Sequence, residues 1–139
     1  KIFNFKKNFI IFKSMTKKRL TKQKETIMRI CLNSPNALSI EDIHNKAKKI
    51  ISSLNLATVY RNINKLVDDG ILTKFSHPQK GTFYEKAGKP HHHHFFCSDC
   101  NTAIEIPGCG LSLDKQINEG FVIDSHEVFL HGTCAKCAS

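Results

Sequence analysis

Apolar residues in the first half of the chain recur three or four positions apart, which is the spacing of one buried face of an α-helix. The pattern appears in three segments, at residues 22–32, 40–54 and 56–70. Their apolar stripes are formed by Ile27, Ile30 and Cys31 in the first, by Ile40, Ile43, Ala47, Ile50, Ile51 and Leu54 in the second, and by Val59, Ile63, Leu66 and Val67 in the third. Three amphipathic helices are therefore predicted.

Residues that start and stop helices agree with this division. "NSPN" interrupts the helical pattern between the first two helices. Ser39 is placed to cap the second helix, with Asp42 three positions on as in a capping box, and Gly70 is placed to end the third. "ILTKFS" and "GTFYEK" then read as two strands joined by the basic turn "HPQKG". Three helices followed by a β-hairpin is the order of a winged helix-turn-helix.

The polar face of the third predicted helix carries the candidate DNA contacts. It contains Thr58, Arg61, Asn62 and Lys65, with Tyr60 at its border. In a major groove, such side chains can bond base edges and phosphates. Flanking phosphates would be neutralised by a basic set, Lys17, Lys18, Arg19 and the wing residue Lys80.

The alternative for this helix is an ordinary solvated polar face, and the distribution of charge favours DNA. Residues 1–87 contain 18 Lys and Arg against 6 Asp and Glu, whereas residues 88–139 contain 3 against 6. The first part therefore suits a polyanionic partner. Five of the six cysteines and six of the eight histidines lie in the second part. Two modules are expected, one for DNA and one for metal.

Two Cys-x-x-Cys pairs are the most specific motif in the chain: Cys97 with Cys100, and Cys134 with Cys137. Two such pairs complete a tetrahedral site with no open position, which is typical of structural zinc. No apolar run approaches the ~20 residues of a membrane span, and no secretory signal is recognisable. We therefore expect a cytoplasmic, reducing environment, in which paired cysteines bind metal and do not form disulfides.

The run "HHHHFF" directly precedes the first cysteine pair. Read as a strand, it sends alternate side chains to opposite faces. Two sets of candidate ligands follow, which are His92 and His94 with Glu85 or Glu105, and His91 and His93 with His126 and Cys109 or Glu105. Mixed nitrogen and oxygen sets suit divalent zinc or iron. A solvated polyhistidine strand or a remnant tag is the alternative, although a tag fits poorly in mid-chain beside a thiolate.

The first fourteen residues, "KIFNFKKNFIIFKS", consist almost entirely of Lys, Ile, Phe and Asn, and the first methionine is Met15. Lysines interrupt the apolar run and no small-residue cleavage site follows, so a signal peptide does not fit. We interpret the segment as an AT-rich leader translated upstream of a start at Met15, or as a disordered arm. An ordered amphipathic arm is the less favoured alternative.

"LATVYRNINKLVDDGIL" resembles the recognition helix of the ferric uptake regulator (Fur) superfamily. "HHHHFFCSDC" and "HEVFLHGTCAKC" resemble that family's metal-binding and dimerisation domain, and the resemblance covers roughly Lys17 to Cys137. It implies a homodimeric bacterial repressor that binds DNA when a regulatory metal is bound, with structural zinc on the four paired cysteines. It also implies a hinge-side regulatory site at Glu85, His92 and His94, with Glu105 as a further ligand, and a second site at His91, His93 and His126.

Two positions depart from the family pattern. Ala37 stands where iron- and peroxide-sensing members usually have a histidine ligand, which disfavours a peroxide sensor most, and His77 in the wing is a candidate replacement. The segment "PGCGLSLDK" is shorter than usual, and Cys109 stands near the usual acidic ligand of the second site. "HHHH" and "GTCAKC" look most like zinc uptake regulators, although those often have cysteine in place of Glu85. Zinc is therefore favoured over iron and manganese as the regulatory metal.

The predicted fold is α+β. A winged helix-turn-helix domain spans residues 15–87, a hinge spans 88–90, and a small α/β metal-binding dimerisation domain spans 91–139. The predicted function is a metal-responsive repressor, not an enzyme, acting as a homodimer on a pseudo-palindromic, AT-rich operator of double-stranded DNA. An iron-responsive repressor is the first alternative. From other classes we consider a constitutive zinc-ribbon nucleic-acid binder and a zinc hydrolase, although the chain lacks a recognisable nucleophile or His-x-x-x-His helix.

Overall fold

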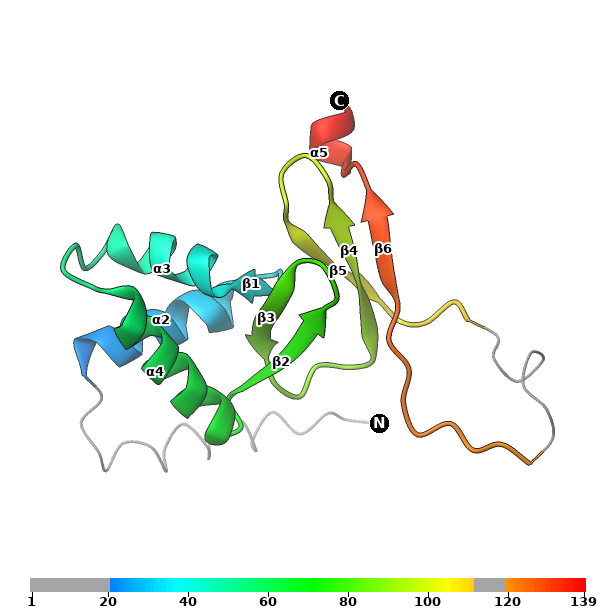
Figure 1. Ribbon diagram of the computed structural model, residues 1–139, viewed down its shortest axis with the longest axis horizontal. Coiled ribbons are helices and arrows are strands. Elements are labelled where there is room, and N and C mark those ends of the chain that lie inside the picture. Colours follow the sequence, from blue (N-terminus) through cyan, green and yellow to red (C-terminus); the bar gives the residue numbers. More distant parts are fainter. Residues whose placement is uncertain (1–20, 112–119) are drawn as a thin grey trace, which may run out of the picture.

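In the computed structural model, residues 21–86 form three helices packed on a small antiparallel sheet (Figure 1). The structure describes residues 21–111 and 120–139, so the predicted leader and the basic residues Lys17, Lys18 and Arg19 lie outside the described residues. The elements are α2 (Lys22–Asn33), β1 (Leu38–Ser39), α3 (Ile40–Lys48), α4 (Leu56–Asp68), β2 (Leu72–His77) and β3 (Gly81–Lys86). Strand β3 lies between β1 and β2, and the predicted winged-helix order is confirmed.

The three predicted apolar stripes meet in one core. Its fully buried members are Ile27, Ile43, Ala47, Val59, Ile63 and Leu66. Leu72 and Tyr84 close the core from the sheet side. Each helix therefore directs its apolar face inward, which leaves the polar face of α4 on the surface.

The second helix is shorter than its apolar spacing predicts. α3 ends at Lys48, and the N–H groups of Ile50 and Ile51 both bond the carbonyl of Ala47, at 3.0 and 2.8 Å. This tight turn redirects the chain, so Ile50 is 51 % exposed while Leu54 still reaches the core. The prediction that Ile50 belongs to the buried stripe is wrong, because a helix followed by a turn can bury Leu54 without it.

Side-chain caps determine where α3 and α4 begin. The predicted capping box of α3 is confirmed: Ser39 Oγ accepts the N–H of Asp42 at 3.1 Å, and the Asp42 carboxylate accepts the N–H of Ser39 at 3.1 Å. At α4, Asn55 Oδ1 accepts the N–H of Thr58 at 2.8 Å. Beyond the end of α4, Gly70 has a φ of 69°, the left-handed conformation expected of a residue that follows a helix.

A second three-stranded sheet follows the linker that leaves β3. It consists of β4 (His92–Cys97), β5 (Ala103–Pro107) and β6 (Phe129–Gly132), and a single-turn helix α5 (Ala135–Ala138) ends the chain. Strand β4 is central, antiparallel to β5 and parallel to β6. Within the described ranges, the helices are all too short or too polar to cross a membrane.

The two sheets are joined by an aromatic cluster. Phe83 of β3 and Phe96 of β4 lie with ring centroids 5.2 Å apart, and Phe75 and Phe129 pack around them. A backbone bridge between Ala37 and Ala103 adds a second connection. Figure 1 accordingly shows the β2–β3 hairpin beside β4. The aromatic cluster therefore holds the wing strands against the sheet that carries the histidines.

The Asn55 cap generates a first prediction. Asn55→Ala removes the acceptor for an N–H in the first turn of α4, and should lower the free energy of unfolding by about 1 kcal/mol. Asn55→Asp keeps the acceptor and should retain most of the stability. Urea unfolding of the three proteins checks this, and equal stability of the alanine variant and the wild type would contradict it.

Candidate metal centres and DNA-binding surface

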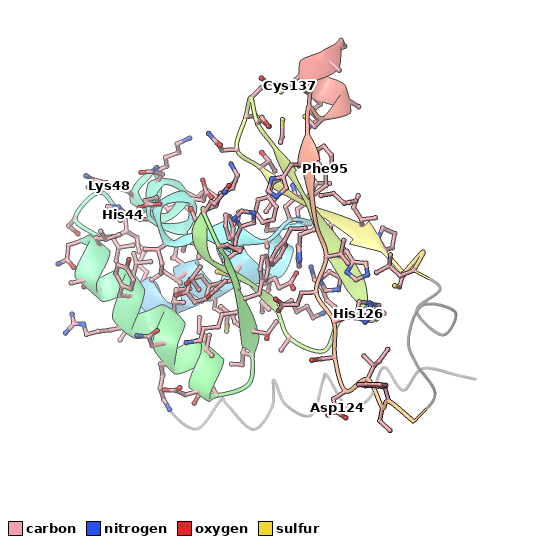
Figure 2. All side chains as sticks on the ribbon, turned by 45° about the vertical axis from the view of Figure 1, so that its right-hand side comes forward. His44, Lys48, Phe95, Asp124, His126 and Cys137 are labelled. Carbon is pink, nitrogen blue, oxygen red and sulfur yellow. The ribbon has the colours of Figure 1, made fainter. Side chains whose placement is uncertain are left out.

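Alternation of side chains along β4 divides the consecutive histidines between two groups of metal-ligand residues. One group faces the wing strands, and the other faces the segment that leads into β6. The four paired cysteines form a third group. These three are the clusters found among the described residues, each with ligand atoms within 4.8 Å of one another. Figure 2 shows that the second and third groups lie at opposite ends of β4: His126 is near the start of the strand, and Cys137 is beyond its other end.

The cysteine cluster contains Cys97, Cys100, Cys134 and Cys137. The Sγ atoms of Cys100 and Cys134 are 3.9 Å apart, much longer than a disulfide bond and close to the about 3.8 Å between two thiolates on one tetrahedral zinc. Backbone hydrogen bonds near Cys100 and Cys134 lower the pKa of Cys97 to about 6. This favours the thiolate form of Cys97, whereas the hydrogen bond with the Cys134 thiol raises the pKa of Cys137 to about 12. The convergence of four sulfur ligands, and not a uniform shift of their pKa values, is what fits a structural zinc ion.

The hinge cluster, defined as Glu85, His92 and His94, joins the wing to the second sheet. Oε1 of Glu85 lies 2.9 Å from His92 Nε2, and its Oε2 lies 3.5 Å from His94 Nε2. The His94 ring stacks on Phe75, with centroids 4.0 Å apart. Burial raises the pKa of Glu85, but hydrogen bonds from His94 and Lys89 outweigh it and lower the pKa to about 2. Glu85 is therefore a buried, ionised carboxylate.

The hydrogen bonding of His92 indicates that this cluster fits a cation. Its Nδ1 lies 2.7 Å from the carbonyl of Pro90, and because a carbonyl only accepts, Nδ1 must carry the proton. In the neutral ring, Nε2 then presents a lone pair to the Glu85 carboxylate. Two acceptors at 2.9 Å repel each other unless a proton or a metal ion lies between them. Two imidazoles and one carboxylate are suitable ligands for zinc or iron.

Lys89, a residue that belongs to no motif in the sequence, lies directly beside the hinge cluster. Its ammonium donates to Oε2 of Glu85 at 3.0 Å and also to Oε2 of Glu105. Burial lowers the pKa of Lys89, but its hydrogen bonds to Glu105 and Glu85 raise it overall. Glu105, a predicted further ligand, is thus paired with an ammonium and stands outside the three-residue cluster.

The second histidine group, here named the His₃Cys cluster, consists of His91, His93, His126 and Cys109. Nε2 of His126 is 3.1 Å from Nε2 of His91 and 3.3 Å from Sγ of Cys109. Two imidazole nitrogens on one tetrahedral zinc would lie about 3.3 Å apart. The structure therefore brings the three predicted histidines together with Cys109, and this cluster contains no carboxylate from residues 21–111 or 120–139.

His93 provides an independent indication that the His₃Cys cluster fits a metal. Its side chain is buried, and its Nε2 atom has no hydrogen-bond partner among the described residues. Burial, followed by the charges of His91 and His126, lowers the pKa of His93 and favours the neutral ring. A buried polar nitrogen without a partner is costly unless something binds it. An ion held by the cluster would satisfy this atom.

His77, considered above as an extra ligand, lies apart from the hinge cluster. Its Nδ1 accepts the N–H groups of Gln79 and Lys80, both at 3.0 Å, so the proton of the neutral ring is on Nε2. That N–H faces Nε2 of His131 in β6 at 3.2 Å. His77 is buried against Phe96, with ring centroids 4.5 Å apart. His77 therefore lies in the contact between the two sheets, and it is not a member of the cluster that contains Glu85.

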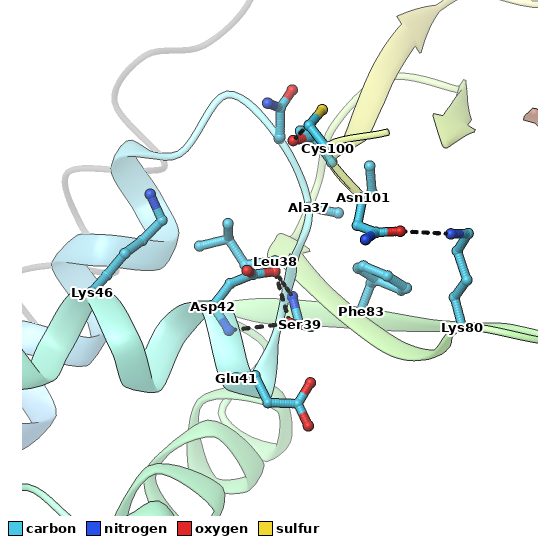
Figure 3. Close-up of a pocket in the computed structure, with 13 residues that line it drawn as sticks. Ala37, Leu38, Ser39, Glu41, Asp42, Lys46, Lys80, Phe83, Cys100 and Asn101 are labelled. Atoms are coloured by element: carbon cyan, nitrogen blue, oxygen red, sulfur yellow. Dashed lines mark hydrogen bonds between the residues drawn. The ribbon is translucent and has the colours of Figure 1, made fainter. Parts of the chain in front are cut away.

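Ala37, which stands where the resemblance predicts a histidine ligand, is buried at the bridge to Ala103. It lines a cleft of about 550 Å³ between α3, the wing and the β4–β5 turn (Figure 3). Lys80 donates to Asn101 Oδ1 at 3.1 Å across this cleft, and Asp42 is occupied by the cap of α3. The described residues that line the cleft include no imidazole, and its acidic and thiol side chains do not together form one of the converging ligand groups found among the described residues.

The predicted DNA-contact residues of α4 differ in exposure. Tyr60, Arg61 and Lys65 are exposed, whereas Asn62 is half-buried and Thr58 is buried. Arg61 Nη2 donates to Thr58 Oγ1 at 3.2 Å, and Asn62 Nδ2 donates to the Thr58 carbonyl at 2.8 Å. Thr58 therefore orients its neighbours. Tyr60, Arg61 and Lys65 are exposed to solvent, and Lys65 pairs with Asp69 at 2.7 Å.

Comparison with known proteins agrees with this combination of winged helix and metal clusters. The chain is 31% identical over 124 residues to a ferric uptake regulation protein of Campylobacter jejuni, covering 86% of this chain and 79% of that one. It is 32% identical over 126 residues to a ferric uptake regulation protein of Bacillus subtilis, covering 86% and 85%. A solved structure of a zinc-bound manganese uptake regulator matches with a TM-score of 0.74 at 26% identity, covering 87% and 94%.

The winged helix and the sheet with three clusters of metal ligands, together with these matches, assign the chain to a class of metal-responsive transcription regulators, which are not enzymes. The chain belongs to the Ferric uptake regulator family, whose model matches residues 15–131. Regulators of this family bind operator DNA as dimers.

Because His77 is held as a neutral ring, stability should depend on pH. Burial, followed by the charges of His131 and Lys80, lowers the pKa of His77 below its ordinary value of 6.5. Below that value the unfolded chain binds the proton more readily than the folded one, so stability is lost as the pH falls. The slope for one group is at most about 1.4 kcal/mol per pH unit.

His77→Phe removes this titration while keeping a ring against Phe96. Its free energy of unfolding should fall less steeply than that of the wild type between pH 7 and pH 5, as measured by urea unfolding. Since all other groups are common to both proteins, parallel slopes would show that His77 does not contribute.

Proposed function

We propose that this protein is a metal-responsive transcriptional repressor that acts in the cytoplasm as a homodimer on pseudo-palindromic operator DNA, and that zinc is its regulatory metal. The observation that carries the proposal is the hinge cluster. Its carboxylate belongs to the wing of the DNA-binding part, and its two imidazoles belong to the central strand of the second sheet. A ligand shared by both parts changes the equilibrium between their relative orientations only if it binds one orientation better.

The residues of the hinge cluster act in this mechanism by holding two elements in one arrangement. Glu85 extends from β3, His92 and His94 extend from β4, and the linker at residues 88–90 serves as the hinge between them. A divalent ion bound there would place a positive charge between the ionised carboxylate of Glu85 and the lone pair of His92, which otherwise repel each other. Held together, the wing and the second sheet keep α4 in the orientation that a symmetric DNA site requires.

Contacts with DNA would be made by the exposed side chains of α4 and by the basic residues around it. Arg61, oriented by Thr58, is the candidate for base or phosphate recognition, and Tyr60 and Lys65 are candidates for phosphate. Lys80 of the wing and the basic set Lys17, Lys18 and Arg19 would neutralise flanking phosphates. The excess of basic residues before residue 88 supports this assignment.

Zinc is supported by the donor chemistry of the clusters. Four thiolates in the cysteine cluster suit structural zinc, and the thiol of Cys109 makes the His₃Cys cluster softer than a carboxylate would. In this proposal Cys109 completes the second site, with His91, His93 and His126.

Iron is the second candidate for the regulatory metal, and a specific observation favours it. Two histidines and one carboxylate are the ligand set of many non-haem Fe(II) sites, and the hinge cluster contains that set. The curated relatives described above are named ferric uptake regulation proteins. A constitutive nucleic-acid binder or a hydrolase has no comparable support from the described residues.

Replacing both hinge imidazoles tests the proposed mechanism. In the wild type, the regulatory metal should tighten binding to operator DNA by about 5- to 150-fold, the usual range for coupling between sites. In His92→Ala/His94→Ala the metal should have no effect on DNA affinity, because the wing and the second sheet no longer share a ligand. Fluorescence anisotropy with operator DNA, with and without metal, measures both values.

His44→Gln is the matched control, because His44 bonds the carbonyl of Leu54 at 3.0 Å and belongs to none of the clusters. It should respond to metal as the wild type does. Zinc retained by the cysteine cluster of the double variant shows that the fold is intact. A metal response preserved in the double variant would refute the mechanism.

Separate anaerobic titrations with Zn²⁺, Fe²⁺ and Mn²⁺ test the choice of metal. Zinc should activate DNA binding at the lowest free concentration, because histidine-rich sites follow the usual order of affinities, in which zinc exceeds iron and manganese. Activation by iron at physiological free concentrations, with none by zinc at its own, would replace zinc by iron in the proposal.

A further inference from the structure

The ammonium of Lys89 lies beside the hinge cluster and pairs with its carboxylate. It bonds Glu85 Oε2 at 3.0 Å and also bonds Glu105 Oε2, and the Lys89 side chain is only 17 % exposed. Glu85 is buried and Glu105 is partly buried. The lysine is therefore a held cation between two carboxylates of different strands, and not a solvated surface charge.

Glu85 is consequently shared between two kinds of partner. Its Oε2 atom faces both Lys89 Nζ and His94 Nε2, while its Oε1 atom faces His92. A divalent ion held by Glu85, His92 and His94 would share that carboxylate with the ammonium. Like charges this close repel, and partly buried surroundings screen them less than water does. Occupation of the cluster by a metal and occupation of Glu85 by Lys89 therefore oppose each other.

We propose that Lys89 is an internal competitor for the regulatory metal, a cation on the chain that neutralises Glu85 and Glu105 until a divalent ion displaces it from Glu85. This inference depends on the regulatory role proposed for the hinge cluster. When a competing state is populated, the apparent affinity for a ligand equals the intrinsic affinity multiplied by the fraction of protein that remains competent to bind. Lys89 thus raises the free metal concentration at which the regulator responds.

The linker sequence makes this competition possible. Lys89 follows Glu85 by four positions, after Gly88, whose φ of 75° turns the chain back. Because of this turn, the Lys89 side chain lies against β3, where it bonds Glu85. When displaced, the ammonium keeps Glu105 as a partner, so it does not have to be fully solvated.

Direct metal titration of Lys89→Met tests the proposal, since methionine keeps the length of the side chain and removes its charge. The background variant His126→Ala/Cys109→Ser disables the His₃Cys cluster, and the zinc of the cysteine cluster is left in place. Co²⁺ titrations followed by absorbance, and Zn²⁺ titrations against a chromogenic chelator, give the affinity of the hinge cluster. Lys89→Met should bind each ion about ten-fold more tightly.

Lys89→Arg is the matched control, because its guanidinium keeps the charge and can bridge two carboxylates. Its metal affinity should stay close to that of the wild type, and Lys89→Gln should behave like the methionine variant. Unchanged or weaker metal binding by both neutral variants, with unaltered thermal unfolding, overturns the proposal.

A second comparison separates competition at Glu85 from recruitment of Glu105. Without Lys89, Glu105 is released and could itself become a ligand. Lys89→Met/Glu105→Gln should bind metal more tightly than Glu105→Gln alone if the ammonium competes at Glu85. Equal affinity of these two variants attributes the gain to Glu105 and overturns the competition.

These titrations contain no DNA, so they test the competition by Lys89 separately from the proposed repressor function. Tighter metal binding by Lys89→Met, without any metal effect on operator binding, leaves the competitor in place and removes the repressor mechanism. In the opposite case, a wild type that requires metal for DNA binding and a Lys89→Met variant of unchanged affinity remove the competitor alone.

Discussion

The two-residue period of β4 is the constraint on which the metal chemistry depends. Because successive side chains of a strand point to opposite faces, four consecutive histidines cannot converge on one ion. His92 and His94 meet Glu85 of the wing, while His91 and His93 meet His126 and Cys109. A slip of one residue in pairing would exchange the two sets, so the ladders with β5 and β6 determine which histidines contact the DNA-binding part.

The size of the second sheet explains why so many ligand residues are gathered there. Its described part has three short strands and one single-turn helix, and the buried side chains at its junction with the wing are few, chiefly Phe83 and Phe96. Small units of this kind usually need a metal or a partner subunit for stability. The cysteine cluster joins the β4–β5 turn to the end of the chain. The two kinds of ligand are therefore separated along one strand, with thiols at one end of β4 and imidazoles at the other.

Much of the fold could be predicted from short-range pattern. The helices around Ile27, Ile43 and Ile63, the capping box at Ser39 and the β-hairpin of the wing all depend on residues within a few positions of each other, and all are present. The end of α3 was missed because an apolar stripe does not distinguish a helix from a helix followed by a turn. Ligand types could also be predicted, because cysteine and histidine at strand spacing have few other uses.

By itself, the sequence determined the elements, the charge division and the sorting of the histidines, since these follow from the local periods of helix and strand. Only the tertiary structure decided which distant groups share an environment. It paired Lys89 with Glu85 and Glu105, placed His77 against His131 and not in the hinge cluster, and brought Cys109 to His126. The physical reason is that electrostatic partners act through space. Charge and hydrogen bonding at a site depend on packing between elements, and no local period encodes that packing.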